Sequence, residues 1–97
     1  MADPLYVTET VILIEVSRHP DCRFRWTRHA LLSVAEDGRT TKDIETGLMN
    51  CRVVLEEWKK DRLWRARGRD LDGREFEAVV AVYEDEIVIK IVTTFSI

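Results

Sequence analysis

The short turn Asp70-Leu71-Asp72-Gly73 constrains the fold more than any other stretch, because it joins two segments of alternating polar and apolar residues. An Asp-Gly pair between such segments predicts a β-hairpin, since glycine readily adopts the left-handed conformation that tight turns require. If Gly73 completes a type I turn with a G1 bulge, Asp70 pairs with Arg74. This pairing fixes the partner of every residue along both strands.

The bulged register separates the charged side chains from the apolar ones. It places Arg67 opposite Glu77 on one face and Trp64 opposite Val80 on the other. A two-residue loop would set Arg67 against Ala78, and because a shift of one residue inverts every side chain, arginines would enter the core. The bulged register is therefore predicted. Its mixed, uncovered face is expected to carry charged residues and valines, among them Arg65, Arg67, Arg69, Glu75, Glu77, Lys90, Val79 and Val88.

Four strands are predicted from alternating or apolar runs, at residues 52–58, 63–70, 74–83 and 86–95. The turn at Glu84-Asp85 is expected to place Ile87, Ile89 and Ile91 beside Val82, Val80 and Ala78. A chain of 97 residues, 45% of them hydrophobic, suffices for one domain with a single core. We therefore predict a single α+β domain over residues 1–97, with N-terminal helices packed on one face of a four-stranded, mainly antiparallel sheet.

Residues 5–18 are the first of the expected helices, although their pattern is ambiguous. Asp3-Pro4 suits the start of a helix, whereas the β-branched run at residues 11–16 suits a strand. We favour the helix. A short extended piece is expected at residues 23–26.

Two short helices are expected between residues 27 and 48. Thr27 can cap the first, which runs to about Asp37 and stops at Gly38. Thr40 and Asp43 resemble a capping box at the start of the second. The inner sides of the two helices are expected to carry Leu31, Leu32 and Ala35 in the first, and Ile44 and Leu48 in the second.

The net charge is −3, but basic residues gather in the middle of the chain. Residues 50–74 carry eight arginine and lysine residues against five acidic ones, which suits either a nucleic-acid footprint or a solvated face. No apolar run approaches the roughly 20 residues needed to cross a membrane. Acids stand near the N-terminus where a signal peptide carries lysine or arginine. We therefore expect a cytoplasmic protein that does not associate with membranes.

Cys22 and Cys51 form neither a C-x-x-C motif nor a metal-ligand cluster, so free thiols are expected. The sequence also lacks a phosphate-binding loop and a nucleophile with its base. These patterns argue against hydrolases of the serine, cysteine or zinc type, and we expect no metal and no cofactor.

His29 is the first candidate for chemistry. It suits a general acid or base in RNA cleavage, because an imidazole titrates near neutral pH. The structural alternative is that the imidazole joins the start of the helix to a neighbouring strand or fills a polar gap, and this alternative is favoured. Contact with a partner is the third interpretation. His19 lies in a turn beside Pro20 and is not placed to cooperate.

The alternate arginines Arg65, Arg67 and Arg69 are the second candidate. They recur at about 7 Å along a strand, a spacing comparable to that of phosphates in single-stranded RNA, so they could hold RNA and stabilise a scissile phosphate. Glu75 and Glu77 opposite them favour the other interpretation, solvated cross-strand pairs. Further RNA-binding candidates are Arg74, Lys59 and Arg62, although a charged turn such as residues 59–62 is typical of a solvated hairpin tip.

These features resemble those of a bacterial family, domain of unknown function 4258 (DUF4258), over nearly the whole chain. The resemblance is carried by the motif T-x-H-A at Thr27, His29 and Ala30, by Gly38, by Arg67-Gly68 with Asp72-Gly73-Arg74, and by Thr93 and Phe95. It implies kinship with the RelE- and BrnT-like ribonuclease toxins and their fold. Members tend to carry arginines where this chain has Ser33 and Asp37, and a tyrosine where it has Phe95. These departures imply a weakened or altered version of the family site.

Two functions remain as expectations. The resemblance favours a metal-independent, toxin-like endoribonuclease of a toxin–antitoxin pair, with His29 and Arg67 catalytic, RNA on the basic face and an antitoxin as partner. The alternative is a non-catalytic module of the same fold, which binds a protein or forms a homodimer through Val79 and Val88 on the mixed face.

Overall fold

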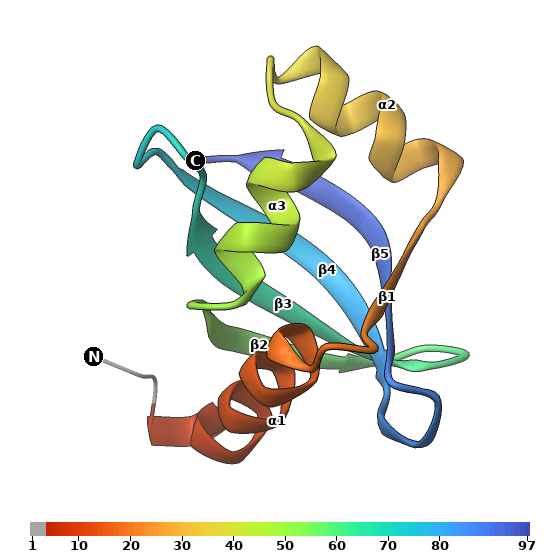
Figure 1. The fold of residues 1–97 in the computed structure, drawn as a ribbon. Helices are drawn as coiled ribbons and strands as arrows, with labels where there is room; N and C mark the ends of the chain where they lie inside the picture. Colours follow the sequence, from red (N-terminus) through yellow and green to blue (C-terminus); the bar gives the residue numbers. More distant parts are fainter. Residues whose placement is uncertain (1–3) are drawn as a thin grey trace.

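The computed structural model describes residues 4–97, in which three α-helices cover one face of a five-stranded mixed sheet (Figure 1). The helices are α1 (Val7–Arg18), α2 (Arg28–Glu36) and α3 (Thr41–Leu48). The strands are β1 (Arg23–Trp26), β2 (Arg52–Trp58), β3 (Arg62–Arg69), β4 (Glu75–Tyr83) and β5 (Val88–Ser96). Their order in the sheet is β1-β5-β4-β3-β2, with β1 parallel to β5 and the other neighbours antiparallel.

The helix predicted for residues 5–18 is confirmed. A 3-10 turn at Pro4–Tyr6 leads into α1, whereas Asp3, the expected cap, lies outside the described residues. Leu13 is fully buried, and Thr10 accepts a hydrogen bond from the backbone N–H of Val53 on β2 at 2.9 Å. Between residues 4 and 97, the structure contains no helix of the length and apolar character that a membrane crossing demands.

The prediction of four strands is wrong, because the extended piece at Arg23–Trp26 is itself a strand. The N–H of Arg23 donates to the carbonyl of Ile87, and the N–H of Thr27 donates to that of Ile91, at 3.0 and 3.1 Å. These bonds hold β1 parallel to β5. Its partner lies more than sixty residues away along the chain, so the local pattern of a four-residue segment gave no sign of the pairing.

The bulged hairpin register is confirmed. Asp70 and Arg74 form the closing backbone hydrogen bond at 2.9 Å, and Gly73 adopts a φ of +83°. Arg67 pairs with Glu77, as expected. On the helix-covered side, the hairpin buries Trp64, Ala66, Phe76, Ala78 and Val80.

The register predicted for β4 and β5 is wrong by two residues near the turn, and by three beyond a bulge between Val79 and Val80, where Ala78 pairs with Thr94. Glu84–Glu86 form a 3-10 turn, and Ile87 adopts a left-handed backbone with a φ of 55°. The longer turn places Ile89 opposite Val82 and Ile91 opposite Val80. Because side chains alternate with a period of two, an offset of two preserves the faces, and Ile89 and Ile91 are buried as expected.

Helix α2 begins at its predicted cap but faces the sheet differently from the prediction. Ala30 and Val34 are buried, whereas Leu31 and Leu32 are 44% and 55% exposed and Ala35 is exposed. The backbone pairing of β1 and the hydrogen bonds of Thr27 fix where α2 starts, and so fix its rotation about its own axis. Helix α2 packs against β5 with Ala30 fully buried, and the leucines point outward.

Helix α3 confirms the predicted capping box. The hydroxyl of Thr40 accepts from the N–H of Asp43, and the carboxylate of Asp43 accepts from the N–H of Thr40. Ile44 and Leu48 are fully buried. They complete a core shared by the three helices and the inner face of the sheet.

Candidate functional site

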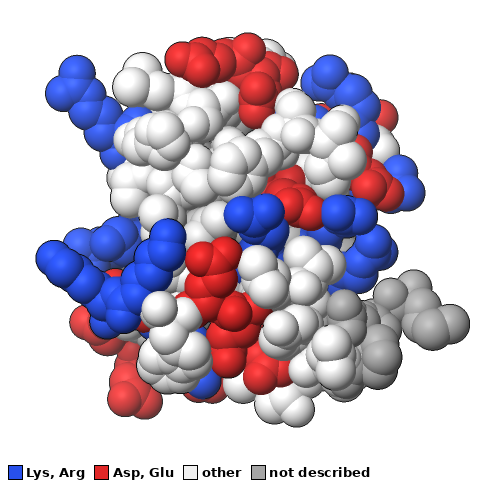
Figure 2. Space-filling model, turned by 180° about the vertical axis from the view of Figure 1, so that it is seen from behind, with Lys and Arg blue, Asp and Glu red and all other residues white. Residues whose placement is uncertain are grey.

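The face of the sheet that the helices leave uncovered carries the three arginines of β3 that the sequence analysis placed there. Arg65, Arg67 and Arg69 alternate along β3 with the buried residues Trp64, Ala66 and Gly68, so the two sets point to opposite faces. Figure 2 looks onto this side of the molecule, where basic and acidic groups lie next to one another with uncharged surface between them.

Acidic side chains on β4 pair with all three arginines. Arg67 donates twice to Glu77, at 2.6 and 3.1 Å, and Arg65 lies 3.6 Å from the other carboxylate oxygen of Glu77. Arg69 donates to the carbonyl of Gly73 at 2.9 Å and lies 3.3 Å from Glu75. Two carboxylates therefore face three guanidinium groups, and the row retains one excess positive charge.

Arg65 has a second contact, with the last aromatic residue of the chain. Its guanidinium carbon lies 5.2 Å from the centre of the Phe95 ring, which is a cation–π distance. Its Nε is buried and has no hydrogen-bond partner within residues 4–97. A group of this kind gains free energy when an acceptor reaches it.

Arg52 adds a fourth guanidinium that sequence reasoning did not single out. It begins β2 directly opposite Arg67, so the two side chains share a face of the sheet. No hydrogen bond or ion pair joins the half-buried Arg52 side chain to any residue in the described part of the chain. The alternation of side chains along β2 could have indicated that Arg52 lies on this face, but a bulge between Val53 and Leu55 interrupts the alternation.

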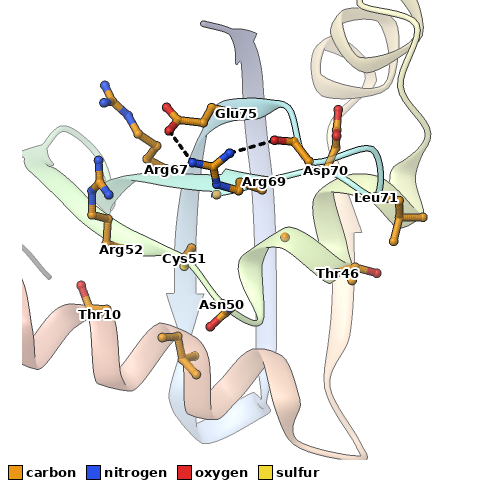
Figure 3. Close-up of a pocket in the computed structure, with 14 residues that line it drawn as sticks. Thr10, Thr46, Asn50, Cys51, Arg52, Arg67, Arg69, Asp70, Leu71 and Glu75 are labelled. Carbon is orange, nitrogen blue, oxygen red and sulfur yellow. Dashed lines mark hydrogen bonds and ion pairs between the residues drawn. The ribbon is translucent and has the colours of Figure 1, made fainter. Parts of the chain in front are cut away.

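A pocket of about 640 Å³ opens beside these arginines, between α1, the end of α3 and the β3–β4 hairpin (Figure 3). Its charged side is formed by Arg52, Arg67 and Arg69 together with Asp70 and Glu75. The remaining walls combine apolar and neutral polar groups, among them Ile14, Leu71, Cys51, Thr46 and Asn50.

The thiol of Cys51 in this pocket is a poor nucleophile. Burial raises its pKa to about 12, so the reactive thiolate is scarce at neutral pH. Burial and the nearby Glu45 also raise the pKa of Cys22. Both cysteines are free, as expected.

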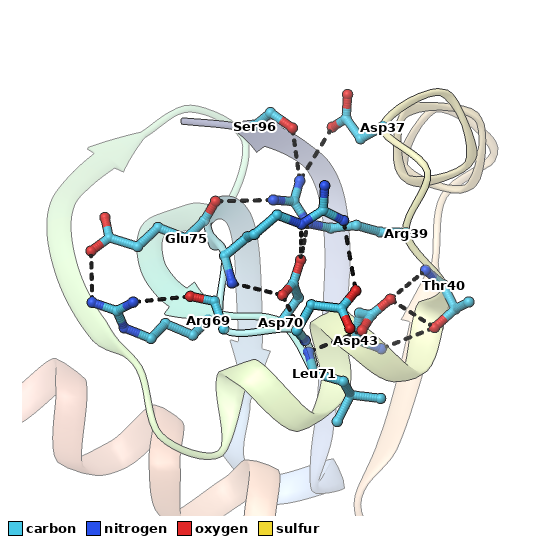
Figure 4. A network of polar contacts seen from close by, with 12 residues as sticks. Asp37, Arg39, Thr40, Asp43, Arg69, Asp70, Leu71, Glu75 and Ser96 are labelled. Atoms are coloured by element: carbon cyan, nitrogen blue, oxygen red, sulfur yellow. Dashed lines mark hydrogen bonds and ion pairs between the residues drawn. The ribbon is translucent and has the colours of Figure 1, made fainter.

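A buried ion pair fixes the hairpin against the helices (Figure 4). Nε of Arg39 donates to Asp70 at 2.8 Å, and the two side chains are only 4% and 1% exposed. Arg39 also donates to the hydroxyl of Ser96 at 2.7 Å and to the carbonyl of Glu75 at 3.0 Å. The backbone N–H groups of Asp72 and Arg74 donate to the second oxygen of Asp70. The positions of Arg69 and Glu75 at the pocket rim depend on this network.

The electrostatics of Asp70 follow from these contacts. Burial alone would raise the pKa of Asp70, but the hydrogen bonds from Arg39, Arg74 and Asp72 outweigh it, and the pKa is lowered. The ionised form is therefore the one that the folded protein holds. Sequence reasoning assigned Asp70 to the turn and did not identify its partner Arg39.

His29 lies in the first turn of α2 and is exposed. It neither joins the helix to a strand nor fills a polar gap, so the favoured structural interpretation is wrong. Thr27 has that role, because its hydroxyl accepts from the N–H of Ala30 at 3.0 Å and donates to the carbonyl of Val92 at 2.8 Å. Helix α2 packs on the covered side of the sheet, whereas Arg67 projects from the other side, so the structure does not bring His29 and Arg67 together.

The remaining RNA-binding candidates lie at the ends of strands or in the turns between them. Arg62 lies on the other face from Arg65, with its guanidinium carbon 4.9 Å from the Trp64 ring centre and 3.7 Å between its Nε and Glu56. Lys59 is exposed at the hairpin tip, 3.9 Å from Glu57. Arg74 lies 3.4 Å from Asp70 and 3.9 Å from Asp72.

Of the two valines expected to bind a partner, Val79 is half-buried on the uncovered face. Val88 is only 2% exposed, which contradicts its placement on an open surface. The reason is the fifth strand: β5 lies between β1 and β4, so Val88 has neighbours on both sides, Arg23 and Tyr83.

Comparison with known proteins identifies the family. In the described part of the chain, no cluster of three histidine, cysteine, aspartate or glutamate residues could hold a metal ion. Residues 26–96 match the family model described as Domain of unknown function (DUF4258). No curated protein and no solved structure matches the chain. The matched region runs from the end of β1 to the end of β5 and includes the whole arginine face, and the chain belongs to the DUF4258 family.

Proposed function

We propose that this protein is a metal-independent, toxin-like endoribonuclease related to the RelE and BrnT toxins, and that it holds RNA on the uncovered face of its sheet. The observation that carries the proposal is the set of four arginines on neighbouring strands, Arg52, Arg65, Arg67 and Arg69. The three arginines of β3 recur at about 7 Å along the strand, a spacing that suits successive phosphates of single-stranded RNA.

In this proposal, Arg67 supplies the chemistry by stabilising negative charge on the scissile phosphate. It is the arginine nearest to the unpaired Arg52, and its hydrogen bonds to Glu77 hold its guanidinium in a fixed orientation. Preorganised donors of this kind favour a transition state that gains negative charge. His29 lies across the sheet, so a catalytic role for His29 requires RNA that passes around the sheet edge.

Induced expression in a bacterial host tests this function. We expect growth arrest that Arg67→Ala relieves and that co-expression of a cognate antitoxin prevents. Arg28→Ala is the matched control, because Arg28 is exposed on α2, and it should leave the arrest intact. Healthy growth under strong induction of the unaltered protein, without any antitoxin, contradicts the proposal.

A second candidate function is a non-catalytic module that binds a protein or a second copy of itself. Two observations favour it: Glu77 already pairs with two arginines, and the apolar side chains of Leu55 and Phe95 are exposed on the same face. It predicts a stable dimer or complex in light scattering that Val79→Asp disrupts. A strictly monomeric protein that cleaves RNA contradicts it.

A further inference from the structure

We propose that the pocket beside Arg52 binds one nucleotide unit, with its phosphate between Arg52 and Arg67 and its base inside the pocket. This inference rests on the proposed function and specifies which contact selects the RNA. It also assigns a binding role to Arg52, Asn50 and Thr46.

The phosphate position follows from the pairing of Arg52 with Arg67. Like charges directly opposite each other on neighbouring strands repel and destabilise a sheet. Glu77 offsets the charge of Arg67, but no acid in the described chain pairs with Arg52. A phosphate bound between the two guanidinium groups removes the repulsion and accepts charge-assisted hydrogen bonds from both.

The base position follows from the composition of the pocket. Its volume of about 640 Å³ lies within the range typical of small-ligand sites. Ile14 and Leu71 offer apolar surface to the faces of a base. The side chains of Asn50 and Thr46 make no hydrogen bond within the described chain, and an asparagine amide offers both a donor and acceptors to a base edge.

The pocket is preformed, because hydrogen bonds tie its walls together. Arg18 on α1 donates to the carbonyl of Met49 at 2.7 Å, which holds the segment that carries Asn50 against the helix. On the other side, the N–H of Leu71 donates to Asp43 at 3.0 Å. A preformed site loses little conformational entropy when a ligand binds.

The test is titration of the full chain with AMP, GMP, CMP, UMP and inorganic phosphate. Calorimetry and the NMR chemical shifts of the backbone amides of residues 46–52 measure the binding. At least one nucleotide should bind, and more tightly than inorganic phosphate. Arg52→Gln should weaken nucleotide binding about tenfold or more, because a hydrogen bond to a charged group is lost. Asn50→Ala should reduce the differences among the four nucleotides. Arg28→Gln, the same change on exposed α2, should have no effect, and circular dichroism checks that each variant is folded.

Three results overturn the inference: no nucleotide binds, inorganic phosphate binds as tightly as every nucleotide, or a folded Arg52→Gln variant binds nucleotides unchanged. The proposed function fails separately. If nucleotides bind in the pocket but the protein neither cleaves RNA nor arrests growth, the endoribonuclease proposal falls and the nucleotide site stands. If the protein cleaves RNA but no nucleotide binds in the pocket, the nucleotide site is disproved and the endoribonuclease proposal stands.

Discussion

Asp70 connects the turn of the hairpin to the rest of the molecule through its buried pair with Arg39. Asp70→Asn removes the carboxylate nearest to Arg39 and leaves its buried guanidinium with only the longer contact to Asp37, at 3.9 Å. We expect a loss of at least about 3 kcal/mol in the free energy of unfolding. Urea denaturation at neutral pH measures it, with Asp72→Asn as the exposed control in the same turn. Equal stabilities of the two variants would show that the pair contributes little.

The same residue predicts a pH dependence. The folded-state pKa of Asp70 is lowered from the ordinary value of 3.8. The ionised side chain therefore contributes fully to the free energy of unfolding above the unfolded-state pKa, and this contribution is lost as the pH falls through the lowered folded-state pKa. The stability difference between the unaltered protein and Asp70→Asn should therefore be constant near neutral pH and shrink as the pH falls below about 4. Denaturation curves across this range measure it. A difference that grows on acidification contradicts the assignment.

Thr27 and His29 give opposite expectations although they stand two residues apart. Thr27→Val removes both the helix cap and the bond to Val92, and should cost about 1–2 kcal/mol. His29→Ala changes an exposed side chain and should alter stability by less than about 0.5 kcal/mol. Thermal and urea unfolding of the two variants compare them. A structural role for His29 is supported only if its variant loses as much stability as Thr27→Val.

At the residue scale, the sequence predicted the side chains whose partners follow from a local rule. Arg67 and Glu77 were matched because one turn determines the register between them. Arg39 and Arg52 were missed because their partners depend on three-dimensional packing. Arg39 contacts residues on both sides of the hairpin turn and near the C-terminus, and a bulge in β2 hides the pairing of Arg52.

At the element scale, the close approach of α3 to the sheet depends on Gly47. A Cβ atom at this position would lie 2.5 Å from the Phe76 ring and 2.6 Å from the carbonyl of Arg69. Gly47→Ala should therefore destabilise the protein by about 1–3 kcal/mol, although the same change in a free helix is stabilising by about 1 kcal/mol. Lys42→Ala on the exposed side of α3 is the control. Stabilisation by Gly47→Ala, measured by thermal unfolding, would show that α3 lies farther from β3.

The elements predicted well are those with strong local signals at both ends. The caps at Thr27 and Thr40 and the turn at Gly73 set their boundaries to within about a residue. The fifth strand and the rotation of α2 were not predictable in this way, because both depend on pairing between β1 and β5. The exposed leucines of α2 show the resulting error. An apolar residue on a helix indicates burial only if the direction of the core is known.

At the scale of the whole molecule, the net charge of −3 means that any attraction for RNA must come from a local surface. Glu77 limits that attraction because it pairs with both Arg65 and Arg67. Glu77→Gln should therefore strengthen RNA binding by about five- to tenfold, which corresponds to about 1 kcal/mol. Fluorescence anisotropy with a labelled single-stranded RNA measures it, with Glu84→Gln in the exposed β4–β5 turn as the charge-matched control. Equal gains in both variants would indicate a general charge effect and no role for this face.

RNA binding at the uncovered sheet face is required by both the proposed cleavage and the proposed nucleotide site. The most direct test is the affinity of the unaltered protein and of the Arg52→Gln, Arg67→Gln double variant for single-stranded RNA, measured over a series of salt concentrations. We predict binding that weakens steeply with salt, and a slope of log affinity against log salt that falls by about one for each arginine removed. No RNA binding at low salt, or the same affinity and slope in both proteins, would contradict the account.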